Sequence, residues 1–180
     1  MSLLGVIALI FGVLGVLLTI LQKIWCWPAA LISVIASSIE FYDQRLFGDM
    51  ALQGFYFVSG IYGWYYWDKN KSVDFKIAHT PFISWIWMFA ATLLQTGIYY
   101  IILKKFKGDK VIMDSILTAA SITGTYMMTK KWIENWIVWV IIDAAYIFLY
   151  GIKEMWLFSV LFFVFTIMAG YGYYSWRKKI

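Results

Sequence analysis

One segment of the chain, K-W-I-E-N-W-I-V-W-V-I-I-D-A-A-Y-I-F-L-Y from Lys131 to Tyr150, combines tryptophans, an amide and a carboxylate at regular spacing. Read as a helix, it places these side chains on one face, because they recur every three or four residues. Flat rings can stack on a flat ligand, the amide can donate and accept hydrogen bonds, and the carboxylate attracts a cation. The face consists of Trp132, Asn135, Trp136, Trp139, Asp143, Tyr146 and Tyr150.

The other faces of this segment are aliphatic, which suits a helix in a lipid bilayer rather than one in water. A carboxylate at the centre of a bilayer costs roughly 2.5–3.5 kcal/mol on insertion scales, so Asp143 needs a partner or a hydrated site. We therefore expect this face of aromatic and polar side chains, which we call the stripe, to line a cavity where a ligand binds. The alternative is a structural hydrogen-bond network of Asp143 with Thr118, Ser121 or Tyr146.

Composition places the chain among integral membrane proteins. Of its 180 residues, 63% are hydrophobic, 21% aromatic and only 14% charged, whereas soluble domains carry about a quarter charged residues. The net charge of +5 comes from lysines and arginines in short loops and at the C-terminus, and so does not indicate nucleic-acid binding. Cys26 is the single cysteine and His79 the single histidine, which excludes an internal disulfide, a multi-cysteine metal site and a histidine metal cluster. We expect no cofactor and no metal.

Hydropathy predicts seven transmembrane helices with short connections and no soluble domain. The predicted spans are 3–21, 28–41, 50–67, 82–103, 111–129, 131–150 and 155–176. We interpret the first span as a retained helix, because it lacks the basic start and the cleavage site of a signal peptide.

An internal repeat organises these spans. The motif Y-G-W-Y-Y-W at 62–67 returns as Y-G-Y-Y-S-W at 171–176, and the same offset of 109 residues aligns Trp27 with Trp136 and Gly15 with Gly124. Three spans and one linker separate the copies, so both enter the membrane in the same orientation. We predict one transmembrane domain over 1–180, with repeat one at 3–67, a linker helix at 82–103 and repeat two at 111–176. A ligand site is expected between the halves.

The two repeats differ in their polar residues, so the site should be asymmetric. The third span carries a second stripe with Gln53, Tyr56 and Trp64, but Gln53 and Tyr56 align with phenylalanines in repeat two. The stripe of 131–150 has no counterpart in the second span. We interpret Trp67 and Trp176 as anchors at the membrane interface, and Gly60, Gly63 and Gly172 as sites of close helix packing.

Several motifs together resemble the Pnu-type vitamin transporters. They are W-I-E-N-W-I-V-W followed by Asp143, L-Q-G-F-Y ahead of I-Y-G-W-Y-Y-W, W-P after the first span, and a terminal G-Y-x-x-W. The resemblance covers the chain from about Gly15 and implies a bacterial inner-membrane homotrimer with a three-one-three helix arrangement similar to the SWEET sugar transporters. It also implies facilitated diffusion of an unphosphorylated vitamin that a cytoplasmic kinase then traps. The site residues implied are Trp132, Asn135, Trp136, Trp139, Gln53, Tyr56 and Trp64.

The stripe itself favours a flat cation, so nicotinamide riboside or thiamine ranks above riboflavin. Members of the nicotinamide riboside branch tend to carry an amide where Asp143 stands, and an acid is more typical of the thiamine branch. We expect nicotinamide riboside as substrate, with thiamine as the alternative, and a uniporter, because the chain has no phosphate-binding loop for ATP. A structural membrane subunit is the alternative outside this class. A membrane enzyme is disfavoured because no paired catalytic groups are apparent.

The positively charged residues predict the orientation in the membrane. With seven spans, nine of the 15 lysines and arginines lie on the side of the C-terminus, among them Lys130, Lys131 and Arg177. Six lie on the other side, at Arg45, Lys104, Lys105, Lys107, Lys110 and Lys153. The positive-inside rule thus predicts a cytoplasmic C-terminus.

Overall fold

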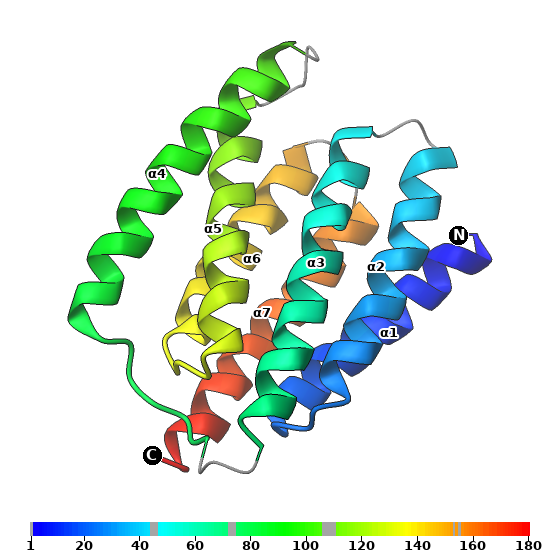
Figure 1. The fold of residues 1–180 in the computed structure, drawn as a ribbon. Helices are drawn as coiled ribbons and strands as arrows, with labels where there is room; N and C mark the ends of the chain where they lie inside the picture. The colour runs from blue at the N-terminus through cyan, green and yellow to red at the C-terminus, as the bar shows by residue number, and fades with distance from the viewer. Residues whose placement is uncertain (1, 44–46, 72–74, 106–110, 153, 155) are drawn as a thin grey trace. The chain divides into compact units, whose positions relative to one another are not determined.

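The computed structural model is all-helical over the residues that it describes, which are 2–180 except 44–46, 72–74, 106–110, 153 and 155 (Figure 1). Among these residues the extended pairing is limited to one parallel bridge, between Ala78 and Trp132. The prediction of an all-α fold with seven helices is confirmed. The helices are α1 (Leu3–Ile20), α2 (Cys26–Asp43), α3 (Phe47–Lys69), α4 (Phe82–Lys105), α5 (Val111–Thr129), α6 (Asn135–Ile152) and α7 (Trp156–Arg177).

Five of the helices, counted over the described residues, are long and apolar enough to cross a membrane on their own. They are α1, α4, α5, α6 and the part of α7 from Phe158 onward. The helix α2 also has 18 residues, but its serines together with Glu40 and Asp43 lower its hydropathy. Four of the charged residues used to predict the orientation, Arg45, Lys107, Lys110 and Lys153, lie outside the described residues.

The predicted helix start at Lys131 was wrong. The helix α6 begins at Asn135, and Trp132 lies in the connection that precedes it. The cause is Lys131, which has a φ of 52°, in the left-handed region. A residue in this conformation ends a helix, so the chain changes direction between α5 and α6. The prediction of α5 at 111–129 is confirmed without change.

The same helix ending occurs after α1. Gln22 has a φ of 55°, the Lys23 N–H donates to the Leu18 carbonyl at 2.8 Å, and the Gln22 N–H to the Thr19 carbonyl at 2.9 Å. After α5 the corresponding bonds run from Trp132 to Met127 at 3.1 Å and from Lys131 to Met128 at 3.0 Å. This pair of bonds is the Schellman motif, in which a left-handed residue satisfies the last carbonyls of a helix. Every residue in one motif lies 109 positions from its equivalent in the other.

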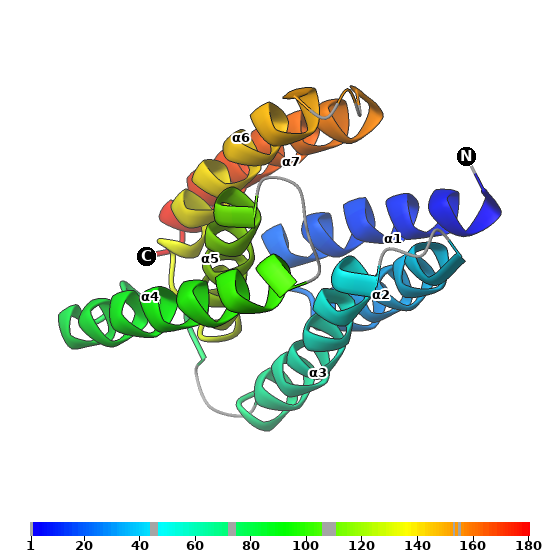
Figure 2. The same ribbon diagram turned by 90° about the horizontal axis from the view of Figure 1, so that it is seen from above.

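The chain divides into two compact units, Met1–Phe75 and Lys76–Ile180. In the first unit α2 packs against both α1 and α3 (Figures 1 and 2). In the second unit α6 packs against both α5 and α7, and α4 packs against α5. Thr92 on α4 and Thr123 on α5 join this last pair by a hydrogen bond between their hydroxyls at 2.6 Å. The equivalent helices α2 and α6 are thus the central helices of their units.

Glycines at equivalent positions admit indole rings of the central helices. A Cβ placed on Gly172 of α7 would lie 2.6 Å from the Trp136 ring, and Gly63 of α3 makes the same approach to Trp27. Gly15 of α1 faces the backbone of Ala30, and Gly124 of α5 faces Trp139, which is the equivalent pair. Gly60 lies against Leu31. The interpretation of Gly60, Gly63 and Gly172 as close-packing sites is confirmed, and the shared contacts support our proposal of an internal repeat.

The interpretation of Trp67 and Trp176 as interfacial anchors was wrong. Trp67 is only 4% exposed and Trp176 is fully buried. Trp67 meets Trp27 edge to face with ring centroids 5.6 Å apart, and Trp176 meets Trp136 in the same way at 5.3 Å. Each pair joins the end of one helix to the start of its neighbour, a packing role that a tryptophan near a helix end does not reveal by position alone.

The glycine contacts generate a prediction about stability. Gly172→Ala and Gly63→Ala should each destabilise the folded protein by about 1–3 kcal/mol, because the added methyl group collides with an indole ring. The matched controls are Gly170→Ala on α7 and Gly54→Ala on α3, where a Cβ would meet nothing within 4 Å. The controls should keep or raise the melting temperature of the detergent-solubilised protein, since alanine favours a helix. Equal effects at Gly172 and Gly170 would contradict the proposed packing.

Candidate functional site

Three residues of the predicted stripe lie on the buried side of α6. Asn135 is fully buried, Trp136 is 2% exposed and Asp143 is 4% exposed. Asn135 and Trp136 form the first turn of the helix, and Asp143 lies two turns further along it. The structure thus brings an amide, an indole and a carboxylate together on one side of a single helix.

Asn135 has one hydrogen-bonding atom engaged and one without a partner. Its Nδ2 donates to the carbonyl of Trp132 at 2.6 Å, whereas its Oδ1 is buried and has no partner within the part of the chain that the structure describes. The indole Nε1 of Trp136 is also buried without a hydrogen-bond partner among the described residues. The same is true of the Nε1 of Trp27, which is the equivalent residue in the first unit. The orphaned acceptor of Asn135 therefore has no equivalent in the first unit, where Cys26 occupies the same position.

Asp143 has no hydrogen bond or ion pair to any other residue that the structure describes, although its side chain is buried. The structural alternative, a network with Thr118, Ser121 or Tyr146, therefore does not form. A buried carboxylate without a partner costs several kcal/mol. Such a group is expected where a ligand supplies the missing interactions.

The other rings of the stripe contact neighbouring helices of the second unit. Trp139 lies against Gly124 of α5. Tyr146 stacks on Phe162 of α7 with ring centroids 4.6 Å apart, and Tyr150 stacks on the same ring at 5.4 Å. Phe162 is the residue that aligns with Gln53, so repeat two has a ring stack where repeat one has an amide.

Trp132 is partly exposed and lies outside the helix, in the connection between α5 and α6. Its ring meets Tyr126 edge to face at 5.8 Å. Although the helical register assumed for Trp132 was wrong, the hydrogen bond from Asn135 to the Trp132 carbonyl keeps the two residues adjacent.

Gln53, Tyr56 and Trp64 belong to α3 in the first unit. Gln53 and Tyr56 are partly buried and Trp64 is 40% exposed. Trp64 follows Gly63, whose close approach to Trp27 fixes this part of α3 against α2. Their participation in one site with α6 stays a prediction.

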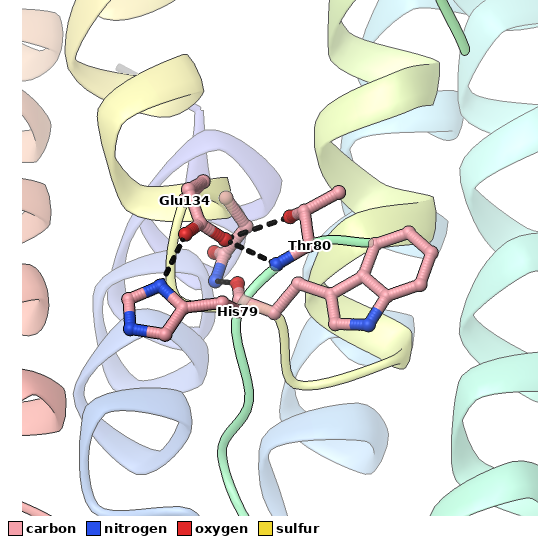
Figure 3. A network of polar contacts seen from close by, with 5 residues as sticks. His79, Thr80 and Glu134 are labelled. Carbon is pink, nitrogen blue, oxygen red and sulfur yellow. Dashed lines mark hydrogen bonds and ion pairs between the residues drawn. The ribbon is translucent and has the colours of Figure 1, made fainter. Parts of the chain in front are cut away.

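The sequence interpretation missed a polar cluster that precedes α6 (Figure 3). One oxygen of Glu134 accepts a hydrogen bond from His79 Nδ1 at 2.7 Å, and the other accepts from the N–H and the hydroxyl of Thr80 at 2.8 and 2.7 Å. The Ala78 N–H donates to the Lys131 carbonyl, and the Ile133 N–H donates to the Ala78 carbonyl. We call residues 78–80 the strap. The available signal was the repeat, since Glu134 stands where repeat one has Trp25.

The environment of Glu134 favours its charged form. Burial acts to raise the pKa of this carboxyl, but the hydrogen bonds from His79 and Thr80 outweigh burial and hold the pKa below its ordinary value of 4.5. Only 19% of the Glu134 side chain is exposed, compared with 71% of the His79 side chain. The carboxylate is thus the enclosed partner of this pair.

The lowered pKa predicts how pH affects the strap. A carboxyl group whose pKa is lower in the folded protein contributes stability above its unfolded pKa and loses it as the pH falls through its folded pKa. The wild type should therefore melt at a higher temperature than Glu134→Gln at pH 7, and the difference should disappear as the pH falls below about 4.5. Glu154→Gln, at an exposed glutamate, is the matched control and should show no such difference. A difference that grows in acid would contradict the prediction.

Comparison with known proteins covers nearly the whole chain. Residues 2–178 match the nicotinamide mononucleotide transporter family. The nicotinamide riboside transporter PnuC of Escherichia coli K12 is 26% identical over 93% of this chain and 82% of its own length. The riboflavin/roseoflavin transporter RibM of Streptomyces davaonensis is 24% identical over 76% of this chain and 66% of its own length.

A solved structure has the same fold. The crystal structure of the vitamin B3 transporter PnuC superposes with a TM-score of 0.78 at 22% identity, and the match covers 97% of this chain and 80% of that one. The predicted resemblance to the Pnu-type transporters is confirmed by the family match and the relatives, and the solved structure confirms the fold. The chain is a multi-pass membrane protein that belongs to the nicotinamide mononucleotide transporter family.

Proposed function

We propose that this protein is a uniporter that carries nicotinamide riboside across the membrane by facilitated diffusion. Family membership and the similarity to PnuC support transport of a vitamin. We place the ligand on the side of α6 that carries Asn135, Trp136 and Asp143. Trp132, Trp139 and Tyr146 flank this surface, and Gln53, Tyr56 and Trp64 of α3 are its proposed partners in the first unit.

The observation that carries the proposal is the orphaned acceptor of Asn135. One N–H of its Nδ2 donates to the Trp132 carbonyl, and Oδ1 is the atom of this amide that has no partner among the described residues. An acceptor of this kind binds a donor, such as the N–H of a carboxamide or a sugar hydroxyl, and nicotinamide riboside has both. A buried polar atom left without a partner costs about 1–3 kcal/mol, which a ligand in this place would recover.

The charge of the proposed site favours an unphosphorylated cation. The nine proposed residues include one carboxylate, Asp143, and no lysine or arginine. The pyridinium ring of nicotinamide riboside is positively charged, so it suits both the carboxylate and the indole rings. A phosphate group would be repelled by Asp143. This argues for the riboside rather than the nucleotide that the family description names.

Riboflavin is the second candidate, because RibM is among the relatives that match this chain. Riboflavin is a flat ring without a fixed positive charge, so it would stack on the indoles without needing Asp143. The relatives above do not favour the thiamine alternative, although thiamine is also a cation and belongs among the test ligands.

A uniporter produces net import only if the imported substrate is removed from the cytoplasm. We propose that a cytoplasmic kinase phosphorylates the imported riboside, since the phosphate prevents its return through a site that lacks cationic side chains. We further propose a homotrimer in the bacterial inner membrane, as the resemblance to the Pnu-type transporters implies. The distribution of lysines and arginines supports a cytoplasmic C-terminus.

The direct test is ligand quenching of tryptophan fluorescence in the purified protein. Nicotinamide riboside should quench at lower concentration than riboflavin, thiamine or the nucleotide. Asn135→Ala should weaken nicotinamide riboside binding about five- to tenfold, the value of one hydrogen bond of about 1 kcal/mol. Cys26→Ala is the matched control at the equivalent position of repeat one and should leave the affinity unchanged. Binding of none of these ligands would favour a structural subunit and contradict the proposal.

Asp143→Asn separates cationic from neutral substrates. Removal of the carboxylate should weaken nicotinamide riboside binding about tenfold or more, because an ion pair out of water is worth more than about 1.4 kcal/mol. Riboflavin binding should be unaffected or improved. The measurement is the dissociation constant for both ligands on wild type and variant. Unchanged affinity for nicotinamide riboside would remove Asp143 from the proposed site.

A further inference from the structure

The two Schellman turns give an internal control for the role of Glu134. Both turns have the same hydrogen bonds, and in both the following helix starts four residues after the left-handed position. In the first unit the position of Glu134 is occupied by Trp25, which is 67% exposed. A carboxylate is therefore not needed to form this turn.

In the second unit Glu134 instead fixes the strap. Both carboxylate oxygens of Glu134 accept hydrogen bonds from residues of the strap. Two of these bonds come from Thr80, which is only 8% exposed. The first residue of the strap, Ala78, is held by two backbone hydrogen bonds. Its N–H donates to the Lys131 carbonyl at 3.2 Å, and its carbonyl accepts from the Ile133 N–H at 3.0 Å. Because Lys131 and Ile133 flank Trp132 in the chain, the strap holds the backbone on both sides of this residue.

These contacts continue into the proposed site. The carbonyl of Trp132 accepts the hydrogen bond from Asn135 Nδ2 at 2.6 Å. If Trp132 moved, the amide of Asn135 would be free to rotate and exchange its acceptor for its donor. The position of the Trp132 backbone therefore decides whether Asn135 turns its oxygen or its nitrogen away from the connection before α6.

We infer that Glu134 is a positioning residue: by holding the strap against the connection before α6, it fixes the Trp132 carbonyl and so presents the Oδ1 acceptor of Asn135 to the ligand. The inference rests on the proposed function and adds a selectivity to it. The site favours ligands with a hydrogen-bond donor at this point, and Glu134 maintains that preference without touching the ligand.

Hydrogen exchange of the ligand-free full chain tests the first half of the inference. In Glu134→Ala, amides in peptides covering 76–81 and 130–138 should exchange at least about tenfold faster than in wild type, because their hydrogen bonds open more often. The peptide covering 21–29 contains the equivalent turn, in which Trp25 occupies the position of Glu134, and its exchange should not change. Glu134→Gln should be intermediate, and Glu154→Gln should match wild type. Unchanged exchange at 130–138 in Glu134→Ala would overturn the inference.

A double-mutant cycle on ligand affinity tests the second half. Glu134→Ala should weaken nicotinamide riboside binding about tenfold or more, since a small misplacement of a binding group is costly. In the Asn135→Ala background the same change should have almost no further effect, because Glu134 acts through Asn135. A merely structural role would give additive effects, and additivity would overturn the proposed route.

The hydrogen-exchange test and the double-mutant cycle together also distinguish a failure of this inference from a failure of the proposed function. If nicotinamide riboside does not bind the wild type, the proposed function fails. The exchange at 130–138 still decides whether Glu134 positions the start of α6, and the same cycle is then run with whichever of riboflavin and thiamine binds.

Discussion

The contact of an indole ring with a glycine backbone determines how each unit is built. In lipid there is no hydrophobic driving force between helices, so close packing must hold them together. Trp136 lies over Gly172 and its ring edge meets Trp176, while Trp27 has the same relation to Gly63 and Trp67. A large ring on the central helix thus fills the space that a missing side chain leaves on its neighbour. This contact also packs the first turn of α6, which carries Asn135, against α7.

The two units share the same packing contacts and helix endings but differ in their polar residues. The glycines, the tryptophan pairs and the left-handed residues Gln22 and Lys131 recur at the same spacing. The residues that differ include Asn135 of the proposed site, which occupies the position of Cys26, and Glu134, which we infer positions it and which occupies the position of Trp25. The connection between the units is anchored at both ends. Phe75 packs on Tyr66 and Trp67, and Ala78 pairs beside Trp132, so only two residues lie between the anchors.

The sequence predicted the all-α membrane class, the number of helices and most of the helix bounds. It could do so because the length of an apolar segment and the spacing of glycines can be read locally in the sequence. It could not predict that Trp132 leaves the helix, since a lysine in the left-handed conformation carries no sign in the sequence. It also misassigned Trp67 and Trp176, because a tryptophan near a helix end has the same spacing whether it faces lipid headgroups or another indole. The strap was missed for a related reason. The bonds between Glu134 and Thr80 join residues 54 positions apart, and no periodicity reports them.

The burial of Cys26 has a practical consequence. This residue is the single thiol of the chain, and it is 2% exposed at the first position of α2. Reagents that alkylate accessible thiols should leave it unmodified, because reactivity requires access to the thiolate. A cysteine introduced at an exposed position would then be the one reactive group, so spin labels and fluorophores can be attached at chosen places without first removing a native thiol.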